Sequence, residues 1–255
     1  MSDLKEKSYV AIKVSVAGGG KDASNRELEV MKQLGLVSRK NPHIVHMMDH
    51  FTLDGPNGDH KCIVLELLGP NVPEIIDACF SDGRLPGKIA KSIARQALLG
   101  LDALHQQKVG HGETLHTPLP VRPPEAIFKD QLDYHVDLWT MGCMLFELFV
   151  GQPPFDSFLI TPEILVSQML EMTSDELPKR WQAPWETMSQ NITIDTSGPN
   201  LQEWLEEMYF DGERKEDLTR EDIIKLGKII GKLLRFEPYS RASAREILDD
   251  PWFRE

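Results

Sequence analysis

Residues 137–142 read Asp-Leu-Trp-Thr-Met-Gly, and they stand in the most apolar stretch of a chain of 255 residues. Apolar side chains recur at helical spacing through residues 132–150, so this stretch predicts a long helix that turns most of its surface toward a core. The helix is predicted to end at residues 151–154, Gly-Gln-Pro-Pro, because glycine and proline terminate helices. A buried helix of this kind indicates further helices packed around it.

Helical spacing marks much of the chain on both sides of this stretch. Residues 89–105 place Ile89, Ile93, Ala97 and Leu101 on one stripe, as a core-facing helix does. Residues 109–121 have no periodicity and contain two prolines and two glycines. Further helices are predicted over residues 72–80, 162–172, 201–209, 220–234 and 242–248.

The first part of the chain has a different pattern. Residues 9–16 are rich in β-branched side chains and predict a strand, and residues 24–36 then have apolar positions near helical spacing. Two more strands are predicted over residues 43–52 and 61–67, and the glycine- and proline-containing residues 54–59 between them predict a hairpin.

Together these elements predict an α+β fold with two lobes. The small, β-rich lobe is expected over residues 1–68 and the larger, mainly helical lobe over residues 69–255, with the break at Leu68-Gly69-Pro70-Asn71. A composition of 41% apolar and 27% charged residues suits a globular protein of this size.

The order of four motifs resembles the protein kinases. Val-Ala-Ile-Lys ends at Lys13, Glu27 lies on the following predicted helix, Arg-Pro-Pro-Glu ends at Glu125, and the Asp137 motif comes next. Residues 52–69 bring the chain nearest to the SR-protein kinases, which phosphorylate serine in arginine/serine-rich segments. The resemblance implies a truncated two-lobed kinase fold, ATP and Mg as cofactors, and a basic, arginine/serine-rich protein substrate.

The resemblance also implies residues for a nucleotide site. Lys13 would pair with Glu27 and point its ammonium group at the α- and β-phosphates of ATP, whereas the alternative for Lys13 is a solvated side chain. Leu65 would be the gatekeeper. Glu66 and Leu68 would offer a backbone carbonyl and a backbone amide to adenine, although residues 63–69 alone predict only a buried strand.

Two further residues carry structural roles in the family. Glu125 would pair with Arg241 near the end of the chain, and the loss of either partner would leave a charge unpaired in the large lobe. Asp137 matches the helix carboxylate that holds the backbone of the catalytic loop. Both roles are structural rather than catalytic.

Several parts of the kinase signature are missing. Glu125 comes only 20 positions after His105, which leaves too little chain for the catalytic loop, two strands, Asp-Phe-Gly and an activation loop. Glu113 falls at the position of the catalytic Asp, no Asp-Phe-Gly occurs, and no glycine-rich loop precedes Lys13. Both metal ligands are therefore missing, and we expect phosphoryl transfer to be impaired because it depends on the metal ions.

The charge balance bears on partners. The chain has 40 acidic and 28 basic side chains, a formal net charge of −12, which disfavours nucleic acid and membrane surfaces and favours a basic protein, although acidity also simply aids solubility. Five acidic residues lie close together in the sequence and are here called the acidic helix cluster: Glu203, Glu206, Glu207, Asp211 and Glu213. This cluster could dock an arginine-rich peptide, or it could be a solvated helix face.

No run of 18 apolar residues occurs and the first residues lack the apolar segment of a secretory signal, so we expect the cytoplasm or the nucleus, or both. Three interpretations stay open: an abridged kinase, a pseudokinase or scaffold that binds a basic protein without chemistry, and a chain that does not fold stably.

Overall fold

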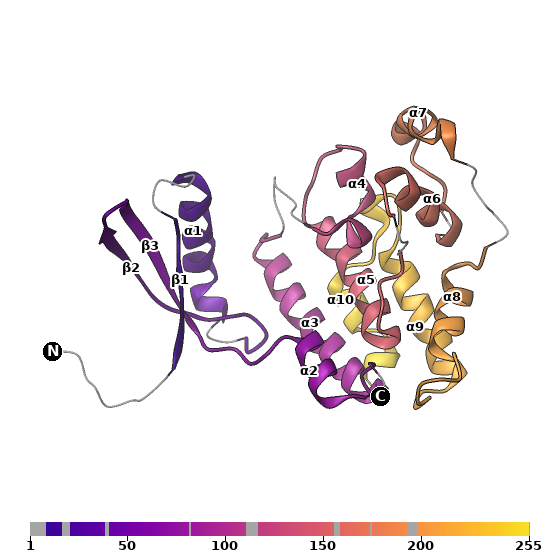
Figure 1. Ribbon diagram of the computed structural model, residues 1–255, viewed down its shortest axis with the longest axis horizontal. Coiled ribbons are helices and arrows are strands. Elements are labelled where there is room, and N and C mark those ends of the chain that lie inside the picture. The colour runs from indigo at the N-terminus through magenta and orange to yellow at the C-terminus, as the bar shows by residue number, and fades with distance from the viewer. Residues whose placement is uncertain are drawn as a thin grey trace. The chain divides into compact units, whose positions relative to one another are not determined.

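The chain forms two compact units, Met1–Val72 and Pro73–Glu255. A computed structural model describes residues 9–16, 21–38, 41–81, 83–110, 117–155, 159–173, 175–192 and 198–254. Its elements are labelled in Figure 1. The predicted boundary lay after Leu68, and the observed units divide after Val72.

The first unit is built on a three-stranded antiparallel sheet in the order β1-β3-β2. The strands are β1 (Val10–Val14), β2 (Met47–Gly55) and β3 (Gly58–Glu66), which confirms the three predicted strands. The hairpin turn is tighter than predicted, since Gly55 still pairs with Gly58, whose φ of 109° is a conformation open mainly to glycine.

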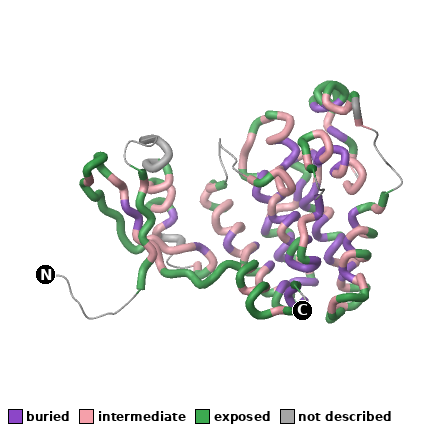
Figure 2. Tube along the Cα trace, viewed as in Figure 1, coloured by how far each residue is buried: buried purple, intermediate pink, exposed green. Residues whose placement is uncertain are grey.

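Helix α1 (Lys21–Ser38) connects β1 to β2 and extends beyond the predicted residues 24–36 at both ends. Few apolar side chains are buried among the described residues of this unit: Leu34, Ile44, Cys62 and Ile63. Figure 2 shows β1 and β2 as mainly exposed. The unit therefore consists of one sheet and one helix with a small apolar core between them.

The second unit is mainly helical, as predicted (Figure 1). The predicted helices are present with ends shifted by a few residues, whereas α4 and α7 were not predicted. Residues 179–188 form α7 despite an internal proline, Pro184. The helices are α2 (Val72–Cys79), α3 (Gly87–Gln106), α4 (Pro124–Ile127), α5 (His135–Val150), α6 (Pro162–Met172), α7 (Lys179–Met188), α8 (Leu201–Tyr209), α9 (Arg220–Leu233) and α10 (Ala244–Leu248).

Helix α5 lies at the centre of this unit and is buried along nearly its whole length (Figure 2). Gly142 lets α9 approach, because a Cβ at this position would lie 2.8 Å from a methyl carbon of Leu234. Gly151 ends the helix with a φ of 87°, a left-handed cap that glycine adopts without strain. The apolar stretch that predicted a buried helix thus forms the core of the second unit.

Among the described residues, no helix is both long and apolar enough to cross a membrane.

Candidate functional site

The first unit brings together Lys13 of β1 and Glu27 of α1. The Lys13 Nζ lies 2.6 Å from a carboxylate oxygen of Glu27, and both side chains keep substantial contact with solvent. The spacing of Lys13 and Glu27 in the sequence does not by itself predict that they meet. Their contact was predicted from the resemblance to the kinase motifs, in which a strand lysine pairs with a glutamate of the next helix. The pair presents an ammonium group held by a neighbouring helix and open to a ligand.

Leu65 lies on the same face of the sheet as Lys13. Ala11 pairs directly with Leu65, and Lys13 pairs with Ile63. Directly opposed residues of an antiparallel pair point to one face, and residues two apart on a strand share that face. Leu65, the predicted gatekeeper, and Lys13, the lysine predicted to bind phosphate, are therefore diagonal neighbours.

Glu66 ends β3 with an unusual exchange of hydrogen bonds. Its backbone N–H donates to the carbonyl of His46 at 3.1 Å, as in a regular antiparallel pair. The return bond goes to its side chain, because the His46 N–H donates to a Glu66 carboxylate oxygen at 2.6 Å. The Glu66 backbone carbonyl is thereby spared that bond, and Leu68 follows it in an exposed, irregular segment.

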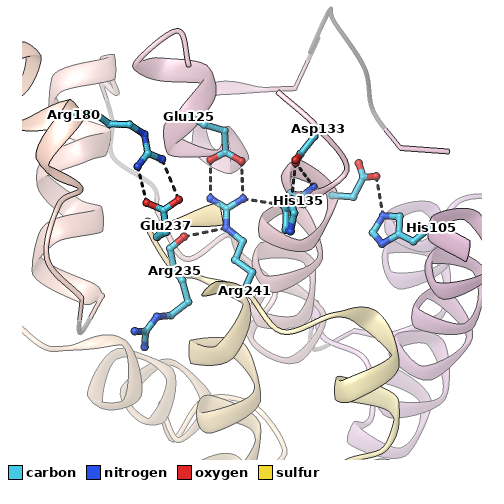
Figure 3. Close-up of polar contacts among 9 residues, drawn as sticks. His105, Glu125, Asp133, His135, Arg180, Arg235, Glu237 and Arg241 are labelled. Carbon is cyan, nitrogen blue, oxygen red and sulfur yellow. Dashed lines mark hydrogen bonds and ion pairs between the residues drawn. The ribbon is translucent and has the colours of Figure 1, made fainter. Parts of the chain in front are cut away.

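The second unit contains a buried ion pair between α4 and the segment after α9. Two guanidinium nitrogens of Arg241 each lie 2.6 Å from one carboxylate oxygen of Glu125, and the exposed fractions of the two side chains are 0% and 1%. Arg241 also donates to the backbone carbonyls of Arg235 at 2.9 Å and His135 at 2.8 Å (Figure 3). The predicted Glu125–Arg241 contact is confirmed.

A second arginine, Arg180, was not predicted from the sequence and binds Glu237 in the segment that follows α9. Arg180 of α7 donates to a carboxylate oxygen of Asp130 at 2.6 Å. It also donates to both carboxylate oxygens of Glu237, at 2.6 and 3.1 Å (Figure 3). The hydrogen bond from Arg180 lowers the pKa of the Asp130 carboxyl. This residue was missed because α7 was not predicted.

Asp137 lies in the first turn of α5, and its side chain is 8% exposed. A carboxylate oxygen lies 3.1 Å from Nε2 of His105 at the end of α3. Asp137 therefore ties α5 to the helix that precedes the region expected to hold a catalytic loop. Glu113, the residue at the catalytic position, lies outside the described residues.

The acidic helix cluster is partly neutralised within the unit. Glu206 pairs with Arg220, and Asp211 pairs with Arg214 at 2.6 Å. Glu203 caps its own helix through the backbone of Asn200. Three of the five members of the cluster are thus engaged in local contacts, which weakens the hypothesis that the cluster docks a peptide.

In the part of the chain that the structure describes, no group of three histidine, cysteine, aspartate or glutamate side chains could hold a metal ion.

Comparison with known proteins gives one matching domain family and several similar proteins. Residues 118–253 match the protein kinase domain. A serine/threonine protein kinase of Aspergillus fumigatus is 24% identical over 324 residues, which cover 98% of this chain and 79% of that protein. SRSF protein kinase 3 of Mus musculus is 31% identical over 173 residues, which cover 66% of this chain and 29% of the mouse protein.

Protein kinase dsk1 of Schizosaccharomyces pombe is 35% identical over 109 residues, or 41% of this chain and 20% of the yeast protein. The Aspergillus alignment extends over 324 residues, whereas this chain has 255. That relative therefore has residues at places where this chain has none.

Proposed function

Because this chain belongs to the protein kinase family, with serine/threonine kinases among its relatives, we propose that it binds ATP at Lys13 and is impaired in phosphoryl transfer. The observation that carries the proposal is the 2.6 Å contact between Lys13 and Glu27. An ion pair of this kind positions the lysine of a kinase for the phosphates of ATP.

Two further features support a nucleotide at this place. Leu65 shares the sheet face of Lys13, so an adenine next to Leu65 would leave its phosphates near the ammonium group. The Glu66 carbonyl is spared its strand bond because the side chain takes the His46 N–H. A carbonyl without this strand bond, next to an exposed segment, suits the exocyclic amine of adenine as an acceptor.

The proposed impairment follows from what the sequence lacks. Asp-Phe-Gly does not occur, and Glu125 comes only 20 positions after His105. The extra length of the Aspergillus relative supports an internal segment missing from this chain. Magnesium would supply charge neutralisation at the phosphates, and the described residues offer it no cluster of ligands, so the proposal assigns it none.

The proposed protein partner is basic and rich in arginine and serine. Its support is the net charge of −12 together with the resemblance to SR-protein kinases and the relative named SRSF protein kinase 3. The same charge favours a second candidate function, a scaffold that binds such a segment without chemistry.

The nucleotide site is tested by titrating the full chain with a fluorescent ATP analogue, with and without magnesium. Lys13→Ala should weaken binding at least tenfold, because a charged hydrogen bond to phosphate is lost. Lys32→Ala is the matched control, since Lys32 is an exposed lysine of α1. Equal affinity of the Lys13→Ala variant and the unaltered chain would refute the site.

Phosphoryl transfer is tested with radiolabelled ATP and an arginine/serine peptide, with a glutamate/serine peptide of equal length as control. We expect the basic peptide to bind and to receive no label. Label on the basic peptide would overturn the impairment, whereas equal binding of both peptides, or of neither, would overturn the proposed partner.

A further inference from the structure

The second unit contains a mainly apolar cavity of about 530 Å³ next to α5. This volume lies within the range of roughly 300–1,000 Å³ that small-molecule sites occupy. The cavity is lined from α3, α5, residues 109–110 and residue 121. Its apolar lining residues are Leu101, Leu104, Val109, Val121, Met141 and Met144.

Two carboxylates interrupt this apolar lining, and no lysine or arginine lines the cavity among the residues that the structure describes. Asp137 is buried and faces His105 at 3.1 Å. Glu147 comes from the same helix, α5, about three turns further along, where it is exposed at the edge of the cavity. The described part of the lining thus presents two carboxylates and no lysine or arginine to a ligand.

Glu147 is the residue that would make the cavity favour a positively charged ligand. Among the described residues its carboxylate has no hydrogen-bond or ion-pair partner, unlike the glutamates of the buried and capping contacts. Partial burial raises the pKa of its carboxyl, since the charged form loses water without gaining a partner. A cation placed beside it would restore the lost stabilisation.

The methionines suit a ligand of variable shape. Met141 and Met144 lie one turn apart on α5 and both line the cavity. Their unbranched thioether side chains adapt to different apolar bodies more easily than branched side chains do. The lining therefore selects for an apolar body without imposing one narrow outline.

We propose that this cavity binds a small organic cation, an amine carried on an apolar body, with the amine at Glu147 and the body against Met141 and Met144. The proposal concerns the second unit and does not depend on nucleotide binding at Lys13. It adds a ligand site that the kinase resemblance does not assign.

The test is a calorimetric titration of the full chain with 4-phenylbutylamine and, as its uncharged counterpart, 4-phenylbutanol. The amine should bind about three- to tenfold more tightly, as expected for one partly solvated ion pair. Glu147→Gln should lower the affinity for the amine to that for the alcohol and leave the alcohol unchanged.

Glu207→Gln is the matched control, because it removes an exposed carboxylate of α8 that does not line the cavity. Met144→Trp fills part of the cavity and should weaken both ligands. The proposal is wrong if neither ligand binds, if both bind equally, or if Glu207→Gln weakens the amine as much as Glu147→Gln. Unchanged binding of both ligands to Met144→Trp would also overturn it.

Discussion

At the scale of single residues, the contacts that motifs predict are those between charged side chains far apart in the sequence. Glu125 and Arg241 are separated by 116 positions and form a two-pronged buried pair. Lys13 and Glu27 also meet as predicted, and the role of that pair in nucleotide binding stays a prediction. The contacts of Arg180 were not predicted, because no motif includes this residue and its partners, Asp130 and Glu237, lie in two other segments.

Glu125→Ala should lower the free energy of unfolding of the second unit by about 3–5 kcal/mol, because it leaves Arg241 buried without its carboxylate. Urea unfolding followed by tryptophan fluorescence measures this directly, since all five tryptophans lie in the second unit. Glu221→Ala removes a solvent-exposed partner of Lys225 and should cost no more than about 0.5 kcal/mol. Equal losses for the two variants would contradict the buried pair.

At the scale of elements, periodicity predicted the long helices well and the boundaries of short elements poorly. Helix α5 was found because its apolar positions recur without interruption and Gly151 closes it. Helix α7 was missed because Pro184 interrupts its pattern, although tertiary packing of Trp181 and Trp185 keeps it helical. Strand β2 is shifted because its ladder continues to Gly55, inside the predicted turn.

Two glycines give opposite expectations for the same substitution. Gly142→Ala should destabilise the second unit by about 1–3 kcal/mol, since the new Cβ would meet Leu234 at 2.8 Å. Gly231→Ala in α9 should stabilise it by about 0.5–1 kcal/mol, because the new Cβ would meet no atom within 4 Å beyond its own helix backbone and alanine favours the helix. Tryptophan-detected urea unfolding of both variants checks this contrast. A loss of stability in Gly231→Ala would contradict the packing of α9.

At the scale of the whole molecule, the sequence predicted a β-rich unit followed by a helical one, and the structure has both. The prediction succeeded because apolar side chains follow the strand period of two residues in the first unit. In the second unit they follow the helix period of 3.6 residues over long stretches of chain. The site was predicted only as far as the family motifs extend. The cavity beside α5 could not be predicted, because it depends on how side chains from four segments pack.

Hydrogen exchange of the full chain, measured with and without ATP, would show where a nucleotide binds. We predict slower exchange in residues 10–14 and 65–68, which carry Lys13, Leu65 and the Glu66 carbonyl, and no such slowing in Lys13→Ala. Unchanged exchange in these residues at saturating ATP, or slowing confined to residues 73–255, would contradict a nucleotide site at Lys13.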